Sequence, residues 1–313
     1  MGTTKSPTLV DWLERWITTY APLRCRSLAT TERYSTLSRY LLVTDELRTV
    51  SETSIDRLTR AGLQAAIVSL IAWPAKRRDH LSPRTVCHFA ALLRVSLERA
   101  ARLDIIDRNP MAGVELPSFI PCGAAARSLT ASEIRRLREV CQGDWTGAFV
   151  ELALATGCRR GELLAIEWPD VDGRVLTIRR SLSETSEGLS IKTPKSGRAR
   201  RCTLPRVALE ALARVTNPRL VFADPATGTY RIPSLVSQVI VRRLQTAGID
   251  GASLHTLRHT HASLLLSGGV PLPAVSARLG HSSPNTTARI YAHALPLDDE
   301  RAAQEWDRLL LAS

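Results

Sequence analysis

Apolar positions in the first 116 residues recur at the spacing of amphipathic helices. Two early stretches each place four large side chains on one helical face, and these are Leu9, Trp12, Leu13 and Trp16, then Tyr34, Leu37, Tyr40 and Leu41. A third apolar stretch covers 55–73, and Ser82 followed by Pro83 is typical of the N-cap and first position of another helix. This part of the chain predicts a bundle of four to five helices.

The helical pattern stops at 117–127, where two prolines, a glycine and a run of alanines show no periodicity. We interpret this stretch as a linker between two domains, 1–116 and 128–313. The second domain opens on a capping box formed by Thr130 and Glu133, which predicts the start of a helix.

Within the second domain the apolar spacing changes to every second position in three short segments, 174–181, 188–192 and 198–205, which predict a small antiparallel sheet. Five helices are expected after it, at 206–215, 233–247, 254–267, 273–279 and 284–293. The tail, 298–313, again carries apolar side chains at helical spacing, namely Ala302, Trp306, Leu309 and Leu310. The predicted fold class is therefore mainly α with a small antiparallel sheet, in a helical domain followed by an α+β domain.

The excess of basic residues indicates a polyanionic partner. The chain has 42 Lys and Arg against 30 Asp and Glu, a formal net charge of +12, and both predicted domains share the excess. DNA or RNA is the expected polyanion, the alternative being a protein that is merely alkaline. The 6 cysteines show no paired spacing, which argues against a zinc site or a disulfide framework and favours a reduced cytosolic protein.

Unusual polar chemistry is concentrated in four segments, of which the first two lie around the predicted sheet. In the first, Gly157 allows a tight turn, Arg159 starts a helix, and Glu162 follows within reach of an arginine. In the second, Lys192 ends a strand at a hairpin, from which it could deliver a proton to a neighbouring cleft. Four further cations follow, and we expect most of them to contact DNA phosphates or to form a solvated loop: Lys195, Arg198, Arg200 and Arg201.

The other two segments carry histidines and a tyrosine. His255 and Arg258 are one helical turn apart on the same face. The two histidines that follow in HTLRHTHAS are disfavoured as metal ligands, because no carboxylate or thiolate lies at a suitable spacing. In LGHSSPNTTARIYAH, His281 follows one short helix, and Tyr291 lies about two turns into the next, where the pattern predicts only partial burial.

Together these groups describe a site for a phosphodiester. Guanidinium groups bind the non-bridging oxygens of a phosphate bidentately, and imidazoles donate hydrogen bonds or move protons. A phenol with a reference pKa of ~10 needs about 4 kcal/mol to ionise at neutral pH, and surrounding cations lower that cost. A lone tyrosine on a short helix is otherwise usually a core residue. The sequence has no acidic cluster of the kind that binds two metal ions, which favours chemistry without a metal.

These motifs and their order resemble the tyrosine recombinases, also called the phage integrase family. TGCRRGEL is similar to the family's first arginine box, IKTPKSGRARR to its hairpin lysine, HTLRHTHAS to its His-x-x-Arg box, and LGHSSPNTTARIYAH to its terminal histidine and tyrosine. The N-terminal helices resemble its core-binding (SAM-like) domain. The resemblance implies the DNA breaking–rejoining fold and a site-specific DNA recombinase.

The resemblance also implies a role for each residue of the site. The phosphate ligands would be Arg159 and Arg258, assisted by His255 and His281 through hydrogen bonds and proton transfer. Tyr291 would attack phosphorus and form a 3′-phosphotyrosyl intermediate.

Further roles and requirements follow from the same resemblance. Lys192 would protonate the leaving 5′-oxygen, with Lys195 as the alternative, and Glu162 would support the first arginine box. The ester retains the energy of the bond it replaces, so the reaction would need no metal ion, ATP or other cofactor. In the first domain we expect four arginines to face the duplex: Arg24, Arg26, Arg33 and Arg84.

Strand exchange in this family implies four copies of the chain on two DNA sites, with 298–313 docked on a neighbouring copy or, alternatively, packed within its own subunit. An accessory DNA-bending or excision factor is a further candidate partner. We expect a cytoplasmic, nucleoid-associated enzyme that integrates or excises a mobile element. The alternatives are a chromosome-dimer resolving recombinase, a type IB-like topoisomerase, and a DNA-binding accessory protein without catalysis.

Overall fold

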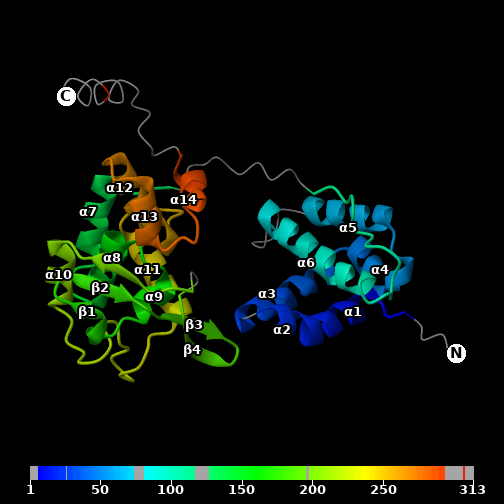
Figure 1. Cartoon of the computed structure of the whole chain (residues 1–313), viewed down its shortest axis with the longest axis horizontal. Helices are drawn as coiled ribbons and strands as arrows, with labels where there is room; N and C mark the ends of the chain where they lie inside the picture. The colour runs from blue at the N-terminus through cyan, green and yellow to red at the C-terminus, as the bar shows by residue number, and fades with distance from the viewer. Residues whose placement is uncertain are drawn as a thin grey trace. The chain divides into compact units, whose positions relative to one another are not determined.

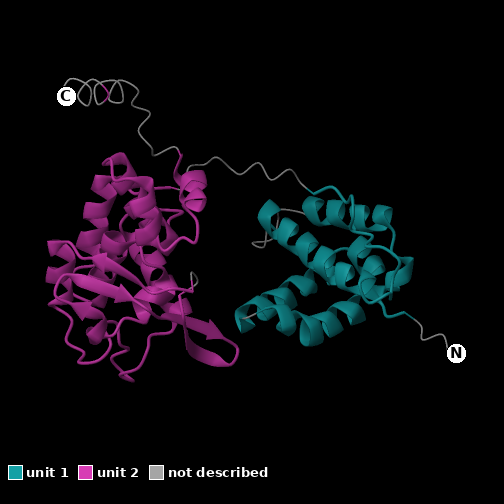
Figure 2. Ribbon diagram, in the orientation of Figure 1, with its two compact units in different colours: residues 1–122 teal, residues 123–313 magenta. Residues whose placement is uncertain are grey.

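The computed structural model describes residues 6–25, 27–73, 81–116, 127–194, 197–292 and 306. The chain divides into two compact units, 1–122 and 123–313 (Figure 2). Of the stretch interpreted as a linker, 117–127, only Arg127 is among the described residues.

Unit 1 is helical. Its α-helices, labelled in Figure 1, are α1 (Leu9–Arg15), α2 (Ala21–Arg24), α3 (Leu28–Ser38), α4 (Asp45–Glu52), α5 (Arg60–Ala72) and α6 (Pro83–Ala101). A π-helical turn (Trp16–Tyr20) follows α1, and 3-10 turns follow α3 (Arg39–Leu42) and α4 (Ile55–Arg57). Ser82 caps α6, as predicted, because its hydroxyl accepts the Thr85 N–H. The core forms around Trp12, whose indole N–H donates to the carbonyl of Ser96, and around Phe89, packed edge-on against Tyr40.

Unit 2 begins with the predicted capping box, in which Thr130 and Glu133 satisfy each other's backbone N–H groups. Its helices are α7 (Ala131–Val140), α8 (Trp145–Thr156), α9 (Arg160–Leu164), α10 (Arg206–Leu212), α11 (Pro233–Thr246), α12 (Leu254–Ser267), α13 (Leu272–Leu279) and α14 (Pro284–Tyr291). Helix α8 packs against both α10 and α12, and α13 packs against α12 and α14 (Figure 1). The helices expected after the sheet are all present, and the mainly helical fold class is confirmed.

The strands of unit 2 form two small antiparallel sheets where a single sheet was predicted. One has the order β1 (Val171–Asp172), β2 (Val175–Ile178), β5 (Arg200–Thr203), and the other is the hairpin of β3 (Ser181–Thr185) and β4 (Gly188–Lys192). The predicted strand 174–181 is interrupted because Arg179 and Arg180 both form ion pairs with the buried carboxylate of Asp170. This interruption turns the chain out of the first sheet and projects the hairpin.

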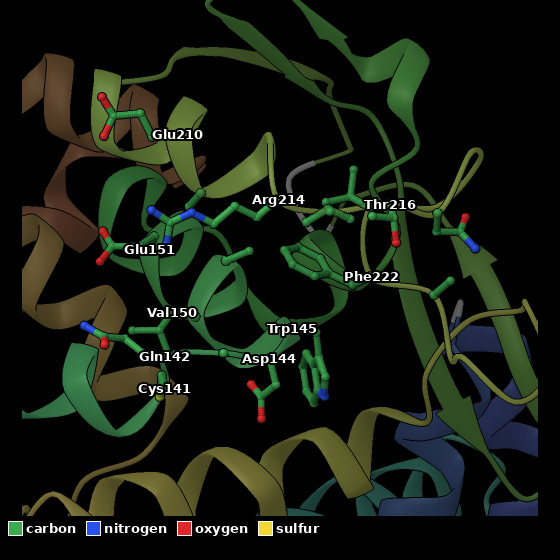
Figure 3. A pocket seen from close by; sticks show the side chains of 18 of the residues that line it. Cys141, Gln142, Asp144, Trp145, Val150, Glu151, Glu210, Arg214, Thr216 and Phe222 are labelled. Carbon is green, nitrogen blue, oxygen red and sulfur yellow. The ribbon is translucent and has the colours of Figure 1, made fainter.

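Two features lie away from the predicted site. A pocket of about 950 Å³ opens between α7, α8 and α10, with Trp145, Glu151 and Arg214 at its wall, and none of the six predicted catalytic residues lines it (Figure 3). Among the residues described, no helix is both long and apolar enough to cross a bilayer.

Gly161 sets the distance between α9 and the hairpin. A Cβ at this position would collide with the backbone oxygen of Leu182 and lie 2.7 Å from the Ser181 hydroxyl. Replacing Gly161 by Ala is therefore expected to lower the free energy of unfolding by about 1–3 kcal/mol, against the higher helix propensity of alanine. Chemical denaturation measures the loss. The same change at Gly268, where the nearest atom would be 3.2 Å away, is the control, and equal stability of the two variants contradicts this account.

Candidate active site

The first arginine box is shaped by a turn and a capping carboxylate. Gly157 ends α8 in the left-handed region, φ 63°, which a residue with a side chain adopts at a cost. Arg159 then caps α9 with an extended backbone. Glu162 accepts a hydrogen bond from the Arg159 backbone N–H (2.9 Å) and another from its guanidinium (3.0 Å). Arg159 is thereby aimed by Glu162, and its side chain is 26% exposed.

A second arginine, Arg200 on β5, binds the same carboxylate. Its two Nη atoms donate to the two Oε atoms of Glu162 at 2.6 and 3.1 Å, and its Nε donates to the carbonyl of Arg278. Burial raises the pKa of Glu162, but the hydrogen bonds and charge of Arg200 outweigh it and leave that pKa below its ordinary value. The expectation that Arg200 lies on a DNA-contacting or solvated loop is not met, because its side chain is 9% exposed and its fork is engaged inside the unit.

Arg258 occupies the centre of the site. It lies on α12 with 5% of its surface exposed, and donates to the backbone carbonyls of Gly157 (2.5 Å) and Leu279 (2.8 Å). Burial lowers its pKa to about 10, and the charge of Arg159 acts in the same direction. Arg258 therefore stays protonated at neutral pH and is held rigidly by main-chain atoms.

The imidazole of His281 is hydrogen-bonded to the guanidinium of Arg258. It follows Gly280, which ends α13 with φ 65° and leaves no room for a side chain beside Arg200. Burial lowers the pKa of His281 to about 4, with Arg258 and Arg159 contributing, so the imidazole is neutral. Its Nε2 lies 2.9 Å from Arg258, which only donates, so Nδ1 carries the proton and donates to the Thr287 hydroxyl at 2.7 Å.

His255 lies near the two arginines of the site, and Lys192 lies on the hairpin of β3 and β4. His255 lies in the first turn of α12, and partial shielding from water lowers its pKa, followed by the charges of Arg258 and Arg159. Lys192 ends β4, opposite Ser181, with its Nζ 3.5 Å from the Ser183 hydroxyl. Lys195 lies outside the described residues, so the choice between the two lysines stays a prediction.

Tyr291 is more deeply buried than its sequence pattern indicates. It ends α14 with 1% of its surface exposed, because α14 packs this face against α13, in a cluster with Leu266, Val275 and Leu279. Burial raises the pKa of the phenol to about 12, although the charge of Arg258 opposes this. The hydroxyl is therefore neutral, and it lies 2.8 Å from Nδ1 of His259.

His259 is the residue of the site that sequence reasoning missed. In the sequence it was considered only as a metal ligand, although its position directly after Arg258 and one turn after His255 was a signal that it faces the same site. The other histidine of that segment, His261, donates through Nδ1 to the carbonyl of Leu154 and accepts from Nε of Arg278. Burial lowers the pKa of His261 to about 4, which fits a structural role between α8, α12 and α13.

The predicted DNA-contacting arginines of unit 1 that are described are all exposed, and they are Arg24, Arg33 and Arg84. Arg33 and Arg84 both lie within electrostatic range of His88, whose pKa is lowered first by burial and then by the charges of these two arginines. Arg198 of unit 2 is exposed as well. Arg26 lies outside the described residues, as does the tail 298–313 except for Trp306, whose surface is 64% exposed.

Comparison with known proteins places these observations in a family. The model of the phage integrase family matches residues 127–297. The chain is 28% identical over 209 residues to a tyrosine recombinase XerC-like protein of Caldanaerobacter subterraneus, a match that covers 57% of this chain and 53% of that relative. The chain thus spans about half the length of this relative.

Solved structures share the fold. The Tn1549 transposon integrase in complex with a circular intermediate DNA superposes with a TM-score of 0.77 at 20% identity, over 96% of this chain and 99% of that one. A lambda integrase tetramer bound to a Holliday junction gives a TM-score of 0.71 at 19% identity, over 90% of this chain and 80% of that one. These likenesses establish the fold of both units.

The carboxylate of Glu162, which Arg159 and Arg200 share, leads to a prediction about stability. Replacing Glu162 by Gln leaves Arg200 buried without its counter-charge, and we expect a loss of about 3–5 kcal/mol. The depressed pKa of Glu162 means that its contribution is complete above about pH 4.5 and is lost as the pH falls below that value. Urea denaturation at several pH values measures it. Glu151→Gln, which breaks a surface ion pair with Arg138, is the matched control and is expected to cost at most about 1 kcal/mol.

The lowered pKa of His281 leads to a prediction about how the free energy of unfolding depends on pH. Its folded pKa of about 4 lies below the ordinary 6.5, so the unfolded chain binds the proton more tightly than the folded chain. The wild type should therefore lose stability as the pH falls from about 6.5 to about 4, and His281→Asn should lose less over the same range. The measurement is the difference in unfolding free energy between the two proteins across this window. A difference that does not change with pH contradicts the assignment of a neutral, partly buried imidazole.

Proposed function

The chain belongs to the phage integrase family, and we propose on that basis that it is a site-specific DNA recombinase that cleaves and rejoins DNA through a 3′-phosphotyrosyl intermediate. The main support for this proposal is the arrangement of side chains around Arg258. The buried guanidinium of Arg258 is bonded to His281 and lies within electrostatic range of both Arg159 and the phenol of Tyr291. A phosphodiester bound there would meet two cations and a nucleophile.

The two arginines are proposed to bind the scissile phosphate. Arg159 uses one Nη atom to bind Glu162, and part of its side chain faces solvent. Arg258 is fixed by two backbone carbonyls before any DNA arrives. Cations that are already oriented stabilise the extra negative charge of a pentacoordinate phosphorane without rearrangement, which is a large contribution to many enzymatic rates.

The remaining groups are proposed to move protons. His255 and His281 have lowered pKa values and are neutral at physiological pH, so they assist without adding charge. Lys192 is proposed to protonate the leaving 5′-oxygen, with Lys195 as the alternative. We propose that no metal ion or ATP takes part, because side-chain cations stabilise the charge and the phosphotyrosyl ester keeps the energy of the broken bond.

The phenol has to lose its proton during attack. With a pKa of about 12 for Tyr291, ionising it beforehand at pH 7 would cost about 7 kcal/mol. A free phenolate is therefore not the resting nucleophile. Proton transfer and formation of the oxygen–phosphorus bond are proposed to occur together, with a proton acceptor already in place.

Integration or excision of a mobile element is the biological reaction that we propose. The support is the likeness to the Tn1549 transposon integrase solved with a circular intermediate DNA. Following the lambda integrase tetramer bound to a Holliday junction, four copies would act on two duplexes, joined through 298–313. An accessory DNA-bending or excision factor would set the direction, and the enzyme would work on nucleoid DNA.

DNA contacts outside the catalytic residues are proposed for the exposed arginines of both units. In unit 1 these are Arg24, Arg33 and Arg84, with Arg26 as a further candidate, and in unit 2 Arg198. Such contacts neutralise phosphates and release counterions, so they would make binding depend on salt without specifying sequence.

The experiment that tests the proposed function is covalent trapping. Nicked duplexes tiled across the DNA that flanks the gene prevent resealing, so an active recombinase accumulates as a protein–DNA adduct on a denaturing gel. We expect the wild type to form this adduct in EDTA and without ATP, and Tyr291→Phe to form none. Tyr230→Phe is the matched control, because that hydroxyl donates to Glu167 away from the site, and it is expected to retain the adduct. Adduct formation by Tyr291→Phe would overturn the assignment of the nucleophile.

A further inference from the structure

We propose that His259 is a catalytic residue that accepts the proton of the Tyr291 hydroxyl as its oxygen attacks phosphorus. The inference rests on the proposed function and goes beyond it by naming the group that makes the phenol a nucleophile. It assigns a reaction step to a histidine whose only sequence-based interpretation was a disfavoured metal site.

The geometry places the acceptor atom directly on the reacting atom. Nδ1 of His259 lies 2.8 Å from the Tyr291 hydroxyl oxygen, and the two ring centroids are 5.5 Å apart. This is hydrogen-bond distance for transfer without an intervening water. The partners come from α12 and α14 and are 32 residues apart in sequence, so the contact is made by the tertiary fold.

The other two histidines of the site are engaged or placed differently. His281 accepts from Arg258 through Nε2 and donates to Thr287 through Nδ1, so both of its ring nitrogens are in use. His255 lies one turn before His259 on α12, with the two ring centroids 6.2 Å apart. Among the described hydrogen bonds, the one made by the Tyr291 hydroxyl goes to His259. Proximity therefore selects His259 as the acceptor.

Binding of DNA would change the net charge around the His259 and Tyr291 pair. In the free protein, Arg258 and Arg159 bring positive charge to the site, which opposes a further cation on an imidazole. A bound phosphodiester brings one negative charge, and the phosphorane that forms brings another. The imidazolium of His259 would then be stabilised by the same centre that it helps to create, so proton acceptance is coupled to the presence of substrate.

The step balances as follows. The O–H bond of Tyr291 breaks and its proton moves to Nδ1 of His259, while the phenolic oxygen forms a bond to phosphorus. The bond from phosphorus to the 5′-oxygen breaks, and that oxygen receives a proton from Lys192 in the proposed scheme. In resealing, the 5′-hydroxyl returns its proton to Lys192 as its oxygen attacks phosphorus, and the bond from phosphorus to Tyr291 breaks as His259 returns its proton to the phenolic oxygen. Neutral His259 must carry its resting proton on Nε2 for this sequence.

The test combines a substitution at His259 with a change in the acidity of the nucleophile. His259→Asn keeps an amide oxygen near the position of Nδ1, so it accepts the hydrogen bond but not the proton. We expect it to form the covalent adduct about 100-fold more slowly than the wild type, a typical loss for a proton-transfer group. Replacing Tyr291 in this variant by a ring-fluorinated tyrosine, which gives up its proton more readily, should restore the rate at least about 10-fold.

Lys192→Ala is the control for the rescue. It removes the acid at the other end of the reaction, so a more acidic phenol should not restore it. If His259→Asn reacts as fast as the wild type, or if its loss is not restored by the fluorinated tyrosine while the variant unfolds like the wild type, His259 is not the acceptor. His259→Gln is used in the same way if the asparagine variant does not fold. Absence of any adduct from the wild type overturns the proposed function itself, and this inference with it.

Discussion

The site depends on keeping four guanidinium groups close together with one carboxylate among them. Arg159 and Arg200 share the two oxygens of Glu162, while Arg258 and Arg278 are bound by backbone carbonyl oxygens. The positive charges of neighbouring arginines repel one another, and each arginine that is removed from water has to recover its hydrogen bonds inside the protein. The carboxylate and the carbonyls supply them. This requires a rigid arrangement of the chain segments that present those oxygens.

Burial and these cations explain the protonation states of His281 and Tyr291. The cations and burial together keep His281 neutral, with a pKa of about 4, while burial dominates at Tyr291 and keeps the phenol protonated. The free protein therefore holds a positively charged site in which His281 and Tyr291 are both uncharged. In the proposed mechanism a phosphodiester supplies the missing negative charge, and its binding makes proton movement from Tyr291 favourable.

Local signals in the sequence predicted much of this arrangement, and contacts between distant segments were not accessible from it. The helices, the capping box of Thr130 and Glu133 and the pairing of Glu162 with an arginine follow from spacings of three or four residues. Arg200 is 38 residues from Glu162, and nothing in its basic, hairpin-like surroundings distinguishes a buried arginine from a solvated one. The same holds for His259 and Tyr291, since the depth at which α14 packs against α13 is set by tertiary structure. The single predicted sheet was wrong because Arg179 and Arg180 form ion pairs with Asp170, a tertiary contact that apolar spacing does not reveal.

The most direct test of the account is to identify the residue that carries DNA after cleavage. Protein trapped on a nicked duplex is digested with a protease and a nuclease, and the peptide bearing a nucleotide is sequenced by mass spectrometry. The account predicts a nucleotide attached through its 3′-phosphate to Tyr291. A nucleotide on any other side chain, or attachment through a 5′-phosphate, would contradict it.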